Sequence, residues 1–227
     1  MSSPIADLIF ENIQKCVALY LLELEAIKFR VTPPFTLTSK NLSPIYINCR
    51  RLISSTTFSD LFALGARQII EREQIKFDVI AGGETAGIPF AALLARALGF
   101  PMIYVRKATM EHGLASRIEG FFQSGKTVLL VEDLITDAGS KLSFINAIRA
   151  AGAAVSDVLV VFDRLQGGKE ALESEGIRLH ALSDMNITLD LLRNLNLVSS
   201  EILQEVLEYL KSPLEWHERY SKYQQQV

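Results

Sequence analysis

The stretch Lys126–Lys141, KTVLLVEDLITDAGSK, constrains the fold of this 227-residue chain more than any other. Its apolar, β-branched run at 127–131 ends at two acids, a pattern typical of a strand buried on both faces of a parallel sheet. A small polar loop at 136–140 follows, and apolar residues at helical spacing predict a helix from Ser140 to about Gly152. The sequence therefore predicts a strand, an acidic turn, a polar loop and a helix.

This order of elements predicts a phosphate cradle at a helix N-terminus. Small residues let backbone N–H groups approach a phosphate closely, and the dipole of the following helix favours its negative charge. The carboxylates of Glu132 and Asp133 repel a phosphate, so we expect them to face ribose hydroxyls or hydrated Mg²⁺. A sugar 5-phosphate is the predicted ligand, and the alternative is an ordinary strand end whose Thr or Ser caps the helix. The loop itself matches neither G-x-x-x-x-G-K-[ST] nor G-x-G-x-x-G.

Composition and charge limit the function classes. The chain is 49% hydrophobic and 22% charged with a formal net charge of −3, which gives no reason to expect a nucleic-acid partner. Cys16 and Cys49 are too few for a disulfide framework and indicate a reducing compartment. We find no signal segment and no apolar run of 18 residues, so we expect a cytoplasmic protein without a membrane partner.

The order of predicted elements indicates an α/β fold. After a helix at 7–27 and a small hairpin within 29–48, strands alternate with helices, which implies a mainly parallel sheet covered on both faces. Two C-terminal helices and a polar tail complete the chain. We expect strands at 77–81, 101–105, 127–131, 157–162 and 177–182, and further helices at 58–75, 88–98, 187–195 and 199–210.

Three polar segments follow predicted strands, where ligands bind in sheets of this kind. They are the glycine-rich loop Gly82–Gly87, the pair Arg106–Lys107 and the segment Glu132–Ser140. The glycines provide either positive φ or close approach of a ligand, and a plain tight turn is the alternative. The connection from 106 to 126 is long for a compact domain, as in lids over active sites.

Five segments, in order, resemble the orotate phosphoribosyltransferases. The stretch 127–140 is similar to the phosphoribosyl pyrophosphate (PRPP) motif of type I phosphoribosyltransferases. The hairpin, with FTLTS and SPIYIN, resembles the family's N-terminal hood over the pyrimidine, and Gly82–Gly87 resembles its pyrophosphate loop. The arg-lys, his-gly and ile-glu-gly elements of 106–120 resemble its mobile loop, and Asp163–Arg164 resembles the pair that holds the orotate carboxylate.

The resemblance implies a fold, a reaction and partners. The fold is that of type I phosphoribosyltransferases, with an N-terminal hood at 1–57 and a core with C-terminal helices at 58–227, as one compact unit. The reaction joins orotate to the phosphoribosyl group of PRPP, giving orotidine 5′-monophosphate and pyrophosphate in pyrimidine biosynthesis. Mg²⁺ is the implied cofactor, held mostly by substrate oxygens and water, with Asp133 as a further ligand. A homodimer that shares the mobile loop is the implied assembly.

The resemblance also assigns roles to residues by position. The acids fix ribose hydroxyls beside a developing cation, the small loop anchors the 5-phosphate, and an arginine holds the substrate carboxylate. Ser43 in the hairpin is a further candidate for a base contact. The implied residues are Glu132, Asp133, Lys107 and His112 for catalysis; Glu84, Thr85, Ala86, Arg106, Lys107, Thr136, Asp137, Ala138, Gly139 and Ser140 for PRPP; and Tyr46, Ile47, Thr136 and Arg164 for orotate.

Three positions depart from the family pattern. Thr38, Ala86 and Met110 stand where relatives often carry lysine, so positive charge is missing near the pyrophosphate. Arg117 is a potential substitute for the lysine at Met110. The departures leave two alternatives open: a PRPP-binding regulator or inactive paralogue, and a phosphoribosyltransferase for another base.

Overall fold

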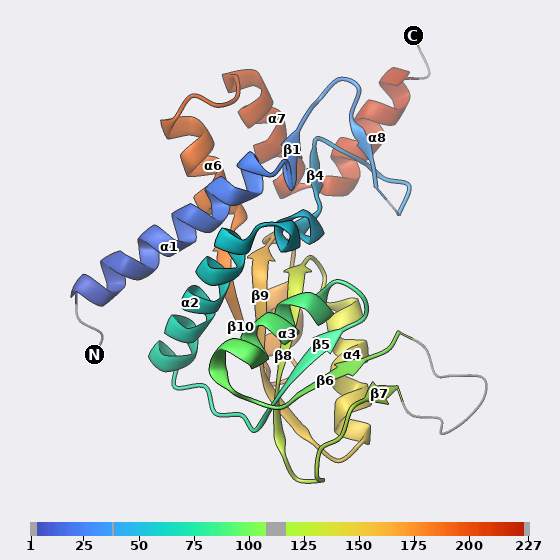
Figure 1. Ribbon diagram of the computed structural model, residues 1–227. Helices are drawn as coiled ribbons and strands as arrows, with labels where there is room; N and C mark the ends of the chain where they lie inside the picture. The colour runs from blue at the N-terminus through green and yellow to red at the C-terminus, as the bar shows by residue number, and fades with distance from the viewer. Residues whose placement is uncertain (1–3, 38, 108–116, 225–227) are drawn as a thin grey trace.

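A mainly parallel six-stranded sheet forms the centre of the molecule (Figure 1). The computed structural model describes residues 4–37, 39–107 and 117–224. The strands are β5 (Val79–Gly83), β6 (Met102–Val105), β7 (Ile118–Glu119), β8 (Thr127–Ile135), β9 (Ala154–Asp163) and β10 (Arg178–Asp184). Their order is β10-β9-β8-β5-β6-β7, parallel from β10 to β6, with β7 antiparallel at the edge. The predicted parallel sheet is confirmed, and β7 lies where the sequence indicated only a loop.

Helices cover both faces of the sheet, as the apolar run in β8 predicted. On one face, α2 (Thr56–Arg72) and α3 (Gly87–Leu98) pack in the same apolar cluster as Leu129 and Val131. On the other face, α4 (Gly139–Ala150) and α5 (Gly168–Glu173) pack in the same cluster as Val128 and Leu130. Because neighbouring strand residues point to opposite faces, both sets are buried and the run is continuously apolar.

The hood and the C-terminal helices gather at the end of the sheet to which the arrows of β8 and β9 point (Figure 1). The predicted hairpin is present as two short antiparallel ladders, β2 with β3 and β1 with β4. The C-terminal helix α8 packs against β3, and α6 packs against α1. The elements are α1 (Pro4–Glu23), β1 (Ile27–Phe29), β2 (Phe35–Thr36), β3 (Leu42–Ser43), β4 (Ile45–Ile47), the 3₁₀ helix η1 (Cys49–Ser54), α6 (Met185–Asn194), α7 (Ser200–Lys211) and α8 (Pro213–Gln224).

The prediction of a polar tail after α7 was wrong, because this segment is the helix α8. Trp216 is only 2% exposed, its ring stacks on Tyr220 at 4.0 Å, and its indole N–H donates to Glu205 Oε2 at 2.8 Å. The Leu42 amide of the hood donates to His217 Nδ1 at 3.0 Å. These few contacts hold a mostly polar helix, so no apolar periodicity marked it in the sequence.

Replacing Trp216 with alanine is expected to lower the free energy of unfolding by about 3–5 kcal/mol, the usual cost of removing a buried tryptophan. The same change is expected to detach α8 and so to break the hydrogen bond from the Leu42 amide to His217. The Leu42 amide is then expected to exchange its hydrogen faster. Leu214→Ala on the same helix is the control, since Leu214 is 64% exposed. Equal effects of the two substitutions in denaturant titrations would show that Trp216 does not anchor the helix.

Within the described part of the chain, no helix is both long enough and apolar enough to cross a membrane.

Candidate active site

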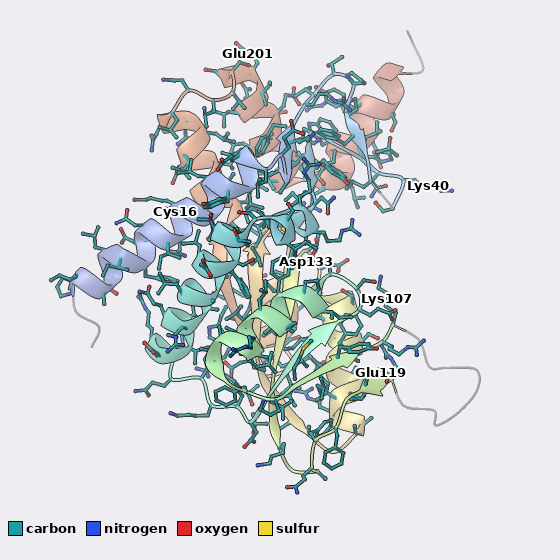
Figure 2. The ribbon with its side chains drawn as sticks, in the orientation of Figure 1. Cys16, Lys40, Lys107, Glu119, Asp133 and Glu201 are labelled. Carbon is teal, nitrogen blue, oxygen red and sulfur yellow. The ribbon has the colours of Figure 1, made fainter. Side chains whose placement is uncertain are left out.

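The three predicted polar segments meet at one end of the sheet, and Asp163–Arg164 joins them there. Strands β6, β5, β8 and β9 are adjacent and parallel, so their carboxyl ends lie side by side at Val105, Gly83, Ile135 and Asp163. Figure 2 shows Asp133 of β8 where the sheet meets the hood, and Lys107 just beyond the end of β6, two strands away. The sequence-based prediction that these segments converge is confirmed by the strand order.

The acids do not form a turn, contrary to the prediction, because β8 continues through Ile135. Glu132 is opposite Val160 in the β8–β9 ladder, so the acidic pair lies inside the sheet. Adjacent strand residues point to opposite faces. The side chains of Glu132 and Asp133 therefore lie on opposite faces of the sheet.

Glu132 lies on the α4 side and is only 4% exposed. Its Oε2 lies 3.2 Å from Lys141 Nζ, whereas Oε1 is buried with no hydrogen-bond partner among the described residues. Burial raises the pKa of Glu132 to about 7, although the Lys141 ammonium acts in the opposite direction. A carboxylate with one unused buried oxygen can accept a hydrogen bond from a hydroxyl group of a ligand.

Gly83, the last residue of β5, and Gly87, the first residue of α3, make room for Glu132. A Cβ on Gly87 would stand 2.6 Å from Val131 O and would also overlap Glu132 Oε1; a Cβ on Gly83 would overlap the same carboxylate. Neither glycine has a positive φ, so close approach, rather than an unusual backbone conformation, explains them. Glu84 and Thr85 follow, joined by a cis peptide bond, and Ala86 precedes α3.

Asp133 lies on the hood side of β8. Burial raises the pKa of its carboxyl group, with the positive charges of Lys141 and Arg50 opposing that effect. The pKa of the Cys49 thiol is also raised, first by burial and then by the nearby Asp133. This carboxylate lies close to Arg50 and Cys49 of η1, and hydroxyl groups or a cation bound on this side would stabilise its charge.

The predicted phosphate loop lies between β8 and α4. Ala138 is the N-cap of α4 with φ of 66°, and its carbonyl accepts from the Leu142 amide at 2.9 Å. Asp137 Oδ1 accepts from the Gly139 amide at 3.1 Å, so this side chain holds one N–H that a phosphate could bind. Thr136 and Ser140 flank these residues at the helix N-terminus, as the sequence predicted.

The two ends of the long connection are tied together beside this loop. The Arg106 amide donates to Arg117 O at 2.7 Å, and Arg106 Nη1 lies 3.4 Å from Glu119 Oε1. The Lys107 amide donates to Glu84 Oε2 at 2.7 Å, which turns Glu84 toward the connection. His112 and Met110 lie outside the described residues.

Arg117 is not free to replace a lysine at position 110. Its Nε donates to Arg106 O at 2.8 Å. Its Nη1 and Nη2 donate to Ser143 O at 3.2 Å and Ser143 Oγ at 3.1 Å. The guanidinium therefore fastens the end of the connection to α4.

Arg164 follows β9, and its guanidinium has unused donors. Its Nε and Nη2 are buried and have no hydrogen-bond partner in the part of the chain that the structure describes. Burial lowers the pKa of Arg164, while Tyr209 of α7 and Cys49 act in the opposite direction. A buried guanidinium with unused donors matches a planar carboxylate. The contribution of α7 through Tyr209 was not predicted, because nothing in the sequence links residues so far apart.

The hood residues have mixed surroundings. Tyr46 is partly exposed, and its ring lies 5.6 Å from that of Phe35. Ile47 pairs with Ile27 in the β1–β4 ladder. Ser43 is fully buried, and its hydroxyl donates to Ile45 O at 2.8 Å, so it serves the hood itself. Thr38 lies outside the described residues.

Two features, one inside the site and one at the opposite end of β8, were not anticipated. Lys141, in the first turn of α4, is buried against Glu132. Residues 120–127, GFFQSGKT, match the letters of the G-x-x-x-x-G-K-[ST] pattern. The structure places them before β8 rather than between a strand and a helix, and Lys126 pairs with Asp78 at 3.1 Å, so they do not form a nucleotide loop.

Comparisons with known proteins agree with this geometry. Residues 60–177 match the model of the phosphoribosyl transferase domain family. The orotate phosphoribosyltransferase of Rhizobium meliloti is 44% identical over 207 residues, which cover 89% of each chain. The crystal structure of the Aeropyrum pernix orotate phosphoribosyltransferase is 28% identical with a TM-score of 0.70, and the match covers 81% of this chain and 99% of that one. The Mycobacterium tuberculosis orotate phosphoribosyltransferase in complex with PRPP is 26% identical with a TM-score of 0.63, covering 78% of this chain and 98% of that one.

Proposed function

The chain belongs to the orotate phosphoribosyltransferase family, and on that premise we propose that it transfers the phosphoribosyl group of PRPP to N1 of orotate. The bond from ribose C1 to the pyrophosphate oxygen breaks as the bond from C1 to N1 forms. The products are orotidine 5′-monophosphate and pyrophosphate, a step of pyrimidine biosynthesis. The observation that carries the choice of orotate is Arg164, whose backbone lies beside the end of β8 and whose buried, unused donors match a carboxylate base.

Each group of site residues would bind a different part of the two substrates. The 136–140 loop would anchor the 5-phosphate at the N-terminus of α4, so remote binding energy orients C1. Asp133 and the unused Oε1 of Glu132 would accept hydrogen bonds from ribose hydroxyls. Their negative charge would also stabilise the cationic ribose of the transition state. Lys107 and Arg106 would add positive charge where pyrophosphate leaves. Tyr46 and Ile47 of the hood would lie over the base.

Mg²⁺ is the proposed cofactor, and the donor set fits a shared rather than a dedicated site. In the described segments there is no group of three His, Cys, Asp or Glu side chains that could hold a metal ion. Mg²⁺ commonly keeps its waters and binds one or two carboxylates together with substrate phosphates, so Asp133 would suffice as the protein ligand. When bound, the ion would neutralise charge on the departing pyrophosphate.

We also propose a homodimer in which His112 and its neighbours cover the site of the second subunit and exclude water. Support comes from the resemblance of 106–120 to the family's mobile loop and from the tie between Arg106 and Arg117. A cytoplasmic location is proposed from the two free cysteines, Cys16 and Cys49.

Orotate consumption is the test of the proposed reaction. Purified protein with PRPP and Mg²⁺ is expected to deplete orotate, followed by its ultraviolet absorbance, and to leave uracil, which lacks the carboxylate, unreacted. Turnover of uracil or a purine instead would assign another base. PRPP binding by calorimetry without any turnover would indicate a regulator. The absence of both binding and turnover would refute the enzyme and the regulator hypotheses alike.

A further inference from the structure

Lys141 occupies an unusual position for a lysine. Its side chain is only 10% exposed in the first turn of α4, and the side chain of its partner Glu132 is 5% exposed. The helix dipole disfavours a cation at this end, and burial of an ammonium is costly unless a carboxylate compensates it. A surface lysine would avoid both costs, so its burial here calls for an explanation.

The ammonium lies between the two halves of the proposed PRPP site. Its Nζ is 3.2 Å from Glu132 Oε2, on the ribose side, and 3.3 Å from Ser140 Oγ, in the phosphate loop. An ammonium has three donors, and these two contacts leave one over. An anion bound by the Ser140 hydroxyl would therefore lie within reach of Lys141.

Local charge also favours a ligand role. Glu132, Asp133 and Asp137 place three acids around a loop that must bind a phosphate. Two arginines at the ends of the long connection are engaged elsewhere, Arg106 with Glu119 and Arg117 with Ser143 on α4. The buried ammonium of Lys141 is directly beside the phosphate loop and offsets the acids.

Building on the proposed function, we propose that Lys141 is a PRPP-binding residue. Its ammonium donates to the 5-phosphate held by the 136–140 loop and at the same time fixes Glu132 toward the ribose. A buried ion pair that served only the fold would affect stability without changing the affinity for one substrate.

The test is Lys141→Gln, which keeps hydrogen-bonding capacity toward Glu132 and Ser140 but removes the charge. Losing one charged hydrogen bond is expected to raise the KM for PRPP about 10- to 100-fold, with the KM for orotate nearly unchanged. Lys141→Arg is expected to recover most of the PRPP affinity. Lys126→Gln is the matched control, because Lys126 pairs with Asp78 at the opposite end of β8 and is 43% exposed.

Wild-type turnover is measured first, so a failure of the proposed function is seen separately. If the wild type is active and Lys141→Gln keeps its KM for PRPP, the role of Lys141 is refuted. A second readout does not depend on the folding of Lys141→Gln. The ¹⁵Nζ signal of Lys141, assigned by its absence in Lys141→Arg, is expected to shift in the wild type when PRPP is added. An unmoved signal at saturating PRPP would overturn the proposal.

Discussion

Asp133→Asn is expected to reduce kcat about 10²- to 10³-fold, the usual loss when one preorganised electrostatic group is removed from an active site. Asparagine keeps the size of the side chain but removes the negative charge that would stabilise the ribose cation. Orotate absorbance assays at saturating PRPP and Mg²⁺ measure the loss. A variant with wild-type kcat would remove Asp133 from the mechanism.

Stability is expected to change in the opposite direction. Burial raises the pKa of Asp133 in the folded state, so ionising this carboxyl group costs more free energy in the folded than in the unfolded protein. The free energy of unfolding therefore falls as the pH rises from the ordinary pKa of an aspartate to the raised pKa of Asp133. The neutral asparagine avoids this cost, and the melting temperature at neutral pH is expected to stay level or rise. A marked fall would show that the carboxylate stabilises the fold.

Asp78→Asn is the matched control at the other end of the sheet. The pKa of Asp78 is lowered, first by the Thr127 amide and then by Lys126, so its ionised form stabilises the folded state above its ordinary pKa. This substitution is expected to lower the melting temperature at neutral pH and to leave kcat unchanged. Asp133→Asn is thus expected to lower kcat without lowering stability, and Asp78→Asn is expected to lower stability without lowering kcat.

The central part of the fold was predictable because its determinants are local. The apolar run of β8, the small loop and the following helix are contiguous, and parallel strand order brings the other motifs to the same edge. The glycines before α3 were found as a loop, and only the structure shows that they make room for Glu132.

The rest depended on distant contacts. The strand extends past the acids because β9 pairs with it as far as Ile135, so Glu132 and Asp133 face opposite sides. Tyr209 approaches Arg164, and α8 is held by contacts with α7 and the hood, none of which leaves a periodic pattern. Lys141 could have been noticed, since a lysine in the first turn of a helix is electrostatically disfavoured.

Arg164→Met is expected to raise the KM for orotate about 30-fold or more, because a buried charged contact is commonly worth 2–5 kcal/mol. The KM for PRPP is expected to change little, since the phosphate loop and acids are untouched. Arg164→Lys is expected to recover only part of the affinity, because a point charge cannot bind a carboxylate in the same bidentate fashion. Steady-state kinetics with each substrate varied in turn give both constants.

Thermal melts distinguish this role from a structural one. Nε and Nη2 of Arg164 lack partners among the described residues, so the free protein is expected to lose little stability when they are removed. The rise in melting temperature that orotate gives the wild type is expected to disappear in Arg164→Met, because that rise measures ligand affinity. Arg193→Met on α6, where the arginine is exposed, is the control and should keep the rise. If orotate still stabilised Arg164→Met fully, the carboxylate would bind elsewhere, and the choice of orotate over other bases would lose its physical basis.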